Sequence, residues 1–125
     1  MRLKEAIDRF DLLFPNALSY DVKRGLISRL DARVQGEVYE NAALPETLPY
    51  DADTPGETLL VIPFPYDDLY LKYLSAETAL LQGDEAKYNS FAAVFNAGYA
   101  AFAAFERRRR LPKKGAFLTL PEVTA

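Results

Sequence analysis

The chain has 125 residues, of which 50% are apolar and 26% are charged, and its net charge is −3. This size and composition are typical of a single globular domain with a sizeable core. The sequence contains neither histidine nor cysteine, which excludes disulfides, thiolate nucleophiles and histidine-based catalysis. We therefore expect a protein that is not an enzyme, with no cofactor and no metal site.

The charge is distributed unevenly along the chain. Residues 1–30 carry six basic and four acidic side chains, for a net charge of +2. Residues 31–85 carry two basic and twelve acidic side chains (−10), and residues 86–125 carry seven basic and two acidic side chains (+5). An acidic middle and a basic end can orient the protein on charged partners or on copies of itself. The alternative is a solvated surface whose asymmetry has no role.

Two helices are predicted at the start. In residues 3–14, apolar side chains recur at intervals of three and four, up to Pro15-Asn16. A second helix is capped by Ser19 or Asp21 and runs to about Asn41. Asp31 and Arg33 in this helix are expected to form ion pairs at the surface, where such pairs contribute little.

Residues 42–63 are expected to form a long inserted loop with one short strand. Prolines, glycine and scattered acids dominate residues 42–58, and a loop of this length is usually a functional or mobile segment. Asp51 and Asp53 resemble the start of a calcium loop, but Pro55 and Ile62 occupy positions where oxygen ligands belong. The apolar run at residues 58–63 predicts the strand, and residues 117–120, in the same or a neighbouring chain, are its candidate partner.

Residues 64–110 are predicted to form a long helical hairpin. Pro65 suits the first turn of one helix, Gly83-Asp84 suits the connecting turn, and the second helix is expected to end at four arginines. On the second helix, two sets of residues spaced by seven form one apolar seam: Tyr88, Phe95 and Phe102, and Phe91, Gly98 and Phe105. Gly98 on this seam predicts a close helix crossing. Residues 88–105 are uncharged over a length that could span a membrane, but the polar residues and the seven-residue repeat favour a bundle helix.

The basic run is the main candidate for a binding site. Arg107, Arg108, Arg109 and Arg110 are followed by Lys113 and Lys114. The run can contact nucleic-acid phosphates, complement the dipole at a helix C-terminus, or bind an acidic protein surface. We favour the protein contact, since no aromatic stacking pattern accompanies the run.

Residues 111–125 are interpreted as a C-terminal arm outside the helical domain of residues 1–110. The arm is either disordered or becomes ordered on a partner. Its apolar residues make it a second candidate for partner binding: Phe117, Leu118 and Leu120.

Several short motifs together resemble the tailed-phage head–tail connector (adaptor) proteins. Those in the second half are Pro65-Tyr66-Asp67-Asp68-Leu69-Tyr70, Tyr73-Leu74, Gly83, Tyr88-Asn89, Phe95-Asn96, Tyr99 and Phe105-Glu106-Arg107. Those in the first half are Lys4-Glu5-Ala6-Ile7, Pro15-Asn16 and Leu30-Asp31-Ala32-Arg33. The resemblance spans most of residues 4–107 and leaves out the loop and the C-terminal arm.

The resemblance implies a ring, expected to be dodecameric, that sits beneath the portal protein in the virion neck and leads to the stopper or tail-completion protein. Packaged DNA would pass through the ring, and residues 111–125 would reach the portal. Assembly would take place in the host cytoplasm, without a membrane. The predicted fold is an all-α four-helix bundle with a long helical hairpin, a long loop and a minor short strand. The alternative function is a small nucleic-acid-binding or packaging accessory protein that uses Arg107–Arg110.

Overall fold

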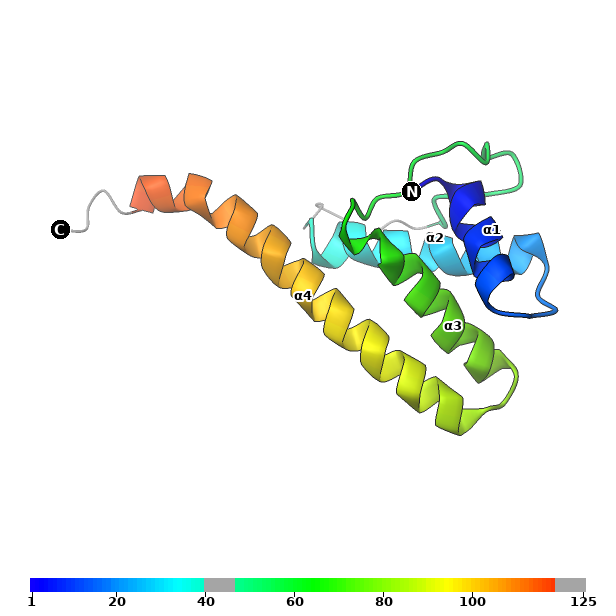
Figure 1. Cartoon of the computed structure of the whole chain (residues 1–125). Coiled ribbons are helices and arrows are strands. Elements are labelled where there is room, and N and C mark those ends of the chain that lie inside the picture. Colours follow the sequence, from blue (N-terminus) through cyan, green and yellow to red (C-terminus); the bar gives the residue numbers. More distant parts are fainter. Residues whose placement is uncertain (40–46, 119–125) are drawn as a thin grey trace.

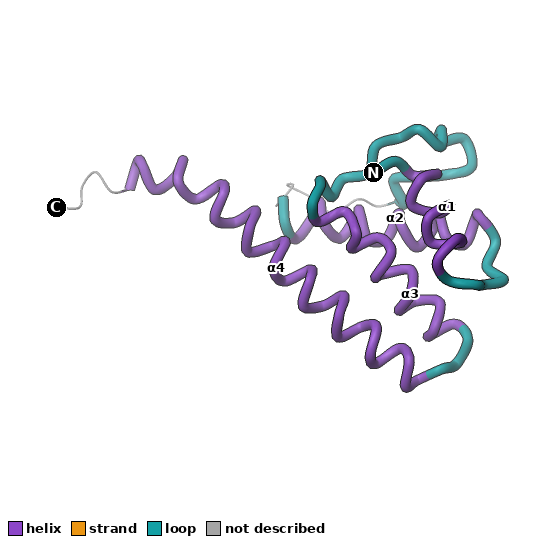
Figure 2. Tube along the Cα trace, in the orientation of Figure 1, coloured by secondary structure: helices purple, strands orange, loops and turns teal. Residues whose placement is uncertain are grey.

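A computed structural model describes residues 1–39 and 47–118, with side-chain surroundings as far as Arg110. Within these residues the fold is an all-α bundle of α1 (Leu3–Leu13), α2 (Tyr20–Glu37), α3 (Leu69–Leu81) and α4 (Glu85–Leu118). A short 3-10 turn, η1 (Tyr66–Asp68), leads into α3. The predicted all-α class is confirmed. In Figures 1 and 2, α3 and α4 are antiparallel, α1 lies on the other side of α3, α2 crosses behind α3, and α4 extends far beyond the bundle. The end of α2 contacts α4, since the Tyr99 hydroxyl donates to the Glu37 carboxylate (2.9 Å).

The first two helices begin close to the predicted positions. The backbone N–H of Arg2 donates to the Glu5 carboxylate before α1 (3.1 Å), and the Ser19 hydroxyl accepts from the Val22 N–H at the start of α2 (3.2 Å). These side chains satisfy N–H groups that have no partner inside a helix. Of the two predicted capping residues, Ser19 is therefore the one that caps α2.

Both long helices end elsewhere than predicted. α2 stops at Glu37 rather than near Asn41, directly after Gly36, a poor helix former. α4 does not stop at Arg110 but continues to Leu118 through Pro112. A proline removes one backbone hydrogen bond and bends a helix without having to end it where the adjacent turns favour helix. Figure 1 shows the last turns of α4 bending away from its main axis.

The predicted short strand at residues 58–63 is wrong for the described residues, which contain no strand. The segment instead forms one isolated antiparallel bridge between Leu59 and Arg2. Its partner is the brief extended segment before α1, which is too short for a ladder: Leu3 N–H donates to the Thr58 carbonyl (2.9 Å) and Leu60 N–H to the Met1 carbonyl (3.0 Å). The alternative partner at residues 117–120 also fails where it is described, since Phe117 and Leu118 belong to α4.

The hairpin turn is formed as predicted. Gly83 adopts a positive φ of 76°, which is open to glycine without strain, and so ends α3. The Asp84 carboxylate then accepts from the Lys87 N–H (3.1 Å) at the start of α4. This three-residue connection, residues 82–84, brings the apolar face of the first half of α4 against α3.

Two residues of the predicted aromatic seam of α4, Phe95 and Phe102, lie in the core together with Tyr99, whereas Tyr88, Phe91 and Phe105 of the seam are half-buried. Phe95, Tyr99 and Phe102 are at most 7% exposed. Tyr73 on α3 packs against Phe95 with 5.2 Å between ring centroids, and Tyr66 packs against Phe102 at 5.5 Å. The rest of the core comes from the other helices and the loop: Leu3, Ile7 and Phe10, Ile27, Leu30 and Val34, Leu60 and Ile62, and Leu69, Tyr70 and Leu74.

Gly98 marks the close crossing of α3 and α4. A Cβ atom added there would lie 2.8 Å from Cδ2 of Leu69, a side chain that is 1% exposed. A contact this short requires the neighbouring side chain to move. The absence of a side chain at position 98 is therefore what lets the two helices approach.

We expect Gly98→Leu to lower the free energy of unfolding by about 1–3 kcal/mol, because it overfills this crossing. The measurement is thermal or urea unfolding followed by circular dichroism. The control is Gly25→Ala on α2, where an added Cβ meets nothing within 4 Å; it should leave stability unchanged or raise it by up to about 1 kcal/mol. An unchanged melting temperature for Gly98→Leu would contradict the close crossing.

Candidate assembly surface

The basic run lies where α4 passes the end of α2 and leaves the bundle. The four arginines occupy one turn of α4, so their side chains project in different directions around the helix. Arg109 pairs with Glu106 on the same helix, and Arg110 contacts the end of α2. Two of the four cations are therefore already engaged within the described residues.

Arg110 holds α4 to the end of α2, and Arg109 forms an ion pair within α4. The Arg109 guanidinium donates to the carboxylate of Glu106 at 2.7 and 3.3 Å, and Glu106 is only 1% exposed. The Arg110 guanidinium donates to the carbonyls of Val38 (3.0 Å) and Tyr39 (3.4 Å), just past the end of α2. A cation at the carbonyl end of a helix is favoured by the helix dipole and satisfies carbonyls that have no helical partner.

Arg107 and Arg108 are exposed, and no ion pair of either is found within the described part of the chain. They are the two residues of the run that remain available to a partner. Of the apolar candidates, Phe117 and Leu118 lie in the last turn of α4, and Leu120 lies outside the described residues. The helix places this last turn far from the bundle (Figure 1).

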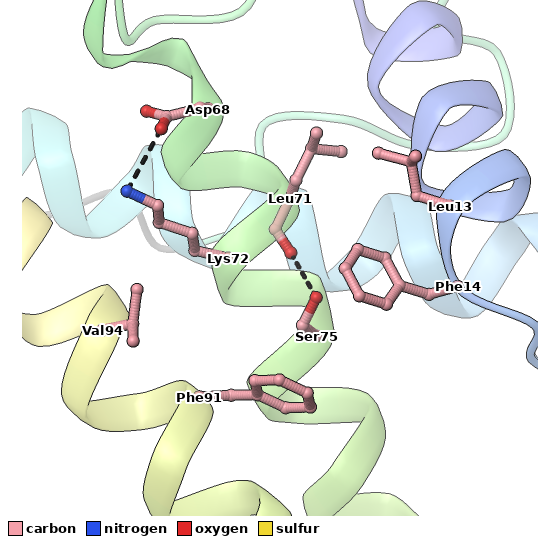
Figure 3. A pocket seen from close by; sticks show the side chains of 8 residues that line it. All are labelled: Leu13, Phe14, Asp68, Leu71, Lys72, Ser75, Phe91 and Val94. Atoms are coloured by element: carbon pink, nitrogen blue, oxygen red, sulfur yellow. Dashed lines mark hydrogen bonds and ion pairs between the residues drawn. The ribbon is translucent and has the colours of Figure 1, made fainter.

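An apolar groove opens on the opposite part of the molecule, among α1, α3 and the first half of α4. Figure 3 shows its side chains converging from the three helices, and its volume is about 390 Å³. Leu13 and Val94 are 60% and 53% exposed at its edges. The apolar lining consists of Leu13, Phe14, Leu71, Phe91 and Val94.

The polar groups of the groove are already engaged. The Ser75 hydroxyl donates to the Leu71 carbonyl (2.8 Å), as expected for serine inside a helix. Lys72 pairs with Asp68 at 3.1 Å, one turn away on α3. Chemically, the groove is suited to apolar side chains rather than to a charged small molecule.

The outward face of α4 is uncharged over several turns. From the second turn of α4 to Ala101 its exposed residues are small or neutral: Asn89, Ser90, Ala93, Val94, Asn96, Ala97, Ala100 and Ala101. A solvent-facing helix surface usually carries charged residues. This face is not covered by the bundle, in contrast to Phe95 and Phe102 of the seam, which are buried.

Asp31 is buried, which corrects the expectation of a surface ion pair. Its carboxylate accepts hydrogen bonds from the Tyr50 and Tyr70 hydroxyls, each at 2.5 Å, and from the Val61 N–H at 3.2 Å. The Tyr70 hydroxyl in turn accepts from the Ile62 N–H (2.8 Å). One carboxylate on α2 therefore fixes α3 and both ends of the segment from Tyr50 to Ile62.

Ser28, one turn before Asp31 on α2, completes this attachment. Its hydroxyl accepts from the Tyr50 N–H (3.0 Å) and donates to the Tyr50 carbonyl (3.2 Å). The described part of the long loop, residues 47–63, is thereby held against the bundle. Arg33 does form the predicted pair, with Glu37 at 2.9 Å, and also stacks over the Tyr99 ring.

Burial changes the pKa values of the ionisable groups in this network. Burial raises the pKa of Asp31 above its ordinary value, although the three donors oppose the shift. Burial and the neighbouring carboxyl group also raise the pKa of both Tyr50 and Tyr70, so both hydroxyls keep their protons and act as donors. All of these groups are used in holding the fold together.

The described residues contain no cluster of three or more acidic, histidine or cysteine side chains that could hold a metal ion. Among the described helices, none combines the length and the apolar character needed to cross a bilayer. Comparison of the chain with protein-family models, curated proteins and solved structures found no match. The candidate assembly surface is therefore defined from the structure alone. It consists of Arg107, Arg108, the groove and the outward face of α4.

We expect Asp31→Asn to lower the free energy of unfolding by about 1–3 kcal/mol, because an amide group would place a donor against the tyrosine and backbone donors. Urea unfolding measures the effect. Asp53→Asn, which changes an exposed carboxylate in the same loop, is the matched control and should stay within about 0.5 kcal/mol of the unaltered protein. Equal stability of the two variants would show that the network contributes nothing.

The Asp31 network should also make stability depend on pH. Since the folded-state pKa lies above the ordinary value of 3.8, the folded state binds the proton more readily than the unfolded chain. The contribution of protonated Asp31 is complete below the ordinary pKa and is lost as the pH rises through the folded-state pKa. The stability of the unaltered protein relative to Asp31→Asn should therefore increase as the pH is lowered from neutrality to the ordinary value of 3.8. A constant difference over this range would contradict the raised pKa.

Proposed function

We propose that this protein is a structural head–tail connector (adaptor) of a tailed phage, which assembles as a ring beneath the portal and links it to the stopper or tail. The observation that carries the proposal is the long helix α4, whose outward face is uncharged and whose far end projects beyond the bundle with Arg107 and Arg108 exposed. Such a surface suits helix packing between protein subunits. The sequence resemblance to connector proteins supplies the phage context.

The placement of charge supports contacts between copies of the chain. The acidic residues Asp51, Asp53 and Glu57 are exposed in the loop beside the start of α1. In Figure 1 this loop and the arginine end of α4 lie at opposite ends of the molecule. A basic surface at one end and an acidic one at the other favour head-to-tail association, and a head-to-tail contact closes into a ring when its rotation permits.

The buried polar groups also support a structural role. Asp31 and Glu106 are the buried carboxylates of the described residues, and each has its partners within the fold. Neither faces the groove. The Asp31 network thus holds the loop in place, and Glu106 is paired within α4.

The second candidate function is binding of nucleic acid through the arginine run, with Arg107 and Arg108 as the exposed cations. Arg109 and Arg110 are already engaged with Glu106 and the end of α2. Two arginines that are not already engaged predict a weak interaction whose logarithmic salt dependence has a slope of only about −2. This observation makes the nucleic-acid function the weaker of the two.

We expect the double variant Arg107→Glu/Arg108→Glu to lose ring assembly and docking on the portal protein encoded by the same genome. Negative-stain microscopy and co-sedimentation with the portal provide the measurements. Lys87→Glu, an exposed charge reversal near the other end of α4, is the control and should assemble normally. Adding Asp51→Lys and Asp53→Lys reverses the charge of the acidic loop. These changes should restore assembly of the double variant if the loop of one copy contacts Arg107 and Arg108 of the next.

Two outcomes would count against the connector. If the Arg107→Glu/Arg108→Glu variant forms normal rings, these two arginines do not take part in the interface between subunits. A wild-type protein that forms no ring, fails to bind the portal and binds duplex DNA at micromolar concentration with a steep salt dependence would favour the nucleic-acid function.

A further inference from the structure

The groove among α1, α3 and α4 is an open apolar surface that the described residues of its own chain leave uncovered. Leu13 and Val94 remain more than half exposed at its edges, and Phe14, Leu71 and Phe91 are partly exposed inside it (Figure 3). Removing such side chains from water is favourable at about 25 cal/mol for each Å² of apolar surface. A concave, largely preformed apolar groove is the usual form of a binding site for an apolar partner.

The end of the chain supplies apolar residues of the matching kind. Phe117, Leu118 and Leu120 follow the basic run, and Glu122 is the one charged residue among the last ten of the sequence. A segment with this composition gains little from exposure to water. It is a natural occupant for a groove lined by leucine, phenylalanine and valine.

The segment cannot reach the groove of its own subunit. Leu118 lies 24 residues beyond Val94 on the same helix, a separation of about 36 Å at 1.5 Å per residue. Even the seven residues 119–125, fully extended, span only about 25 Å. Figure 1 agrees, since the end of α4 points away from the bundle that contains the groove.

We propose that the groove of one copy binds Phe117, Leu118 and Leu120 of a second copy. Because the groove and the segment are different surfaces, each copy has one of each to offer, and the contact is head-to-tail. The inference rests on the proposed function, in that it supplies a subunit contact for the ring. It departs from the expectation that residues 111–125 bind the portal.

The chain contains no cysteine, so disulfide crosslinking can be directed to chosen positions. We mix one variant that carries Val94→Cys with a second, differently tagged variant that carries Leu120→Cys, and oxidise the mixture mildly. A disulfide-linked pair containing both tags is expected. The control replaces Val94→Cys by Leu80→Cys, an exposed leucine at the end of α3 outside the groove, and should give at least tenfold less of the linked pair.

Charge substitutions test the same contact without oxidation. Val94→Glu and Leu120→Glu should each abolish self-association in sedimentation velocity, while the melting temperature stays unchanged, because Val94 is already half exposed. Leu80→Glu is the matched control and should assemble like the unaltered protein. The use of one variant on each side keeps the test decisive if either of them folds poorly.

The outcomes separate this inference from the connector proposal. If Val94→Glu and Leu120→Glu form normal rings, the groove contact is overturned and the connector proposal stands. The same conclusion follows if the Leu120→Cys chain crosslinks to the portal but not to the Val94→Cys chain. A specific link between Val94→Cys and Leu120→Cys in a protein that neither forms rings nor binds the portal would support the groove contact and reject the connector. A protein that stays monomeric and gives no link would overturn both.

Discussion

The close packing of α4 against α3 determines most of what this molecule presents to its surroundings. Gly98 lets the helices approach until Leu69 fills the space that a side chain would take, and Phe95, Tyr99 and Phe102 are buried along the same line. Because a helix has a fixed angular repeat, burying these residues points the alanine-rich side of α4 outward. The outward face is therefore a consequence of the crossing as much as of its own composition.

A second constraint acts through polar groups rather than apolar contact. The segment from Tyr50 to Ile62 has little regular structure of its own, so its backbone groups need partners elsewhere. Asp31, Ser28 and Tyr70 supply them from two helices, at a site where burial disfavours the charge. A buried carboxylate with three donors fixes one arrangement of the loop, since displacing the loop would leave Asp31 without partners in a poorly solvated site.

These two constraints separate the scaffold from the surfaces that we propose for assembly. The outward face of α4, the pair Arg107 and Arg108, and the exposed groove residues Leu13 and Val94 lie outside the core, whereas Phe14 and Leu71 of the groove also pack against it. The groove and the end of α4 lie too far apart to satisfy each other within one copy. This separation is the physical reason for proposing association between copies, with the phage neck as the setting that the sequence motifs suggest.

The sequence alone determined the features that depend on local chemistry. The period of the apolar residues, the Ser19 cap, the Gly83-Asp84 turn and the close approach at Gly98 follow from helix geometry and from the properties of individual residues. The charge asymmetry is equally a property of the sequence. The excess of apolar residues near the C-terminus is also evident from the sequence, and their binding to a partner is a prediction.

Only the tertiary structure decided which residues share an environment. Asp31 reads as a surface acid until Tyr50 and Tyr70, 19 and 39 residues away, are placed beside it. Arg109 and Arg110 are indistinguishable in sequence from Arg107 and Arg108, but Glu106 and the end of α2 engage two of the four. The apolar run at residues 58–63 lacks a strand partner of sufficient length, so packing into the core prevails over its β propensity. In each case the outcome depends on contacts between residues far apart in the chain, which local periodicity and propensity do not encode.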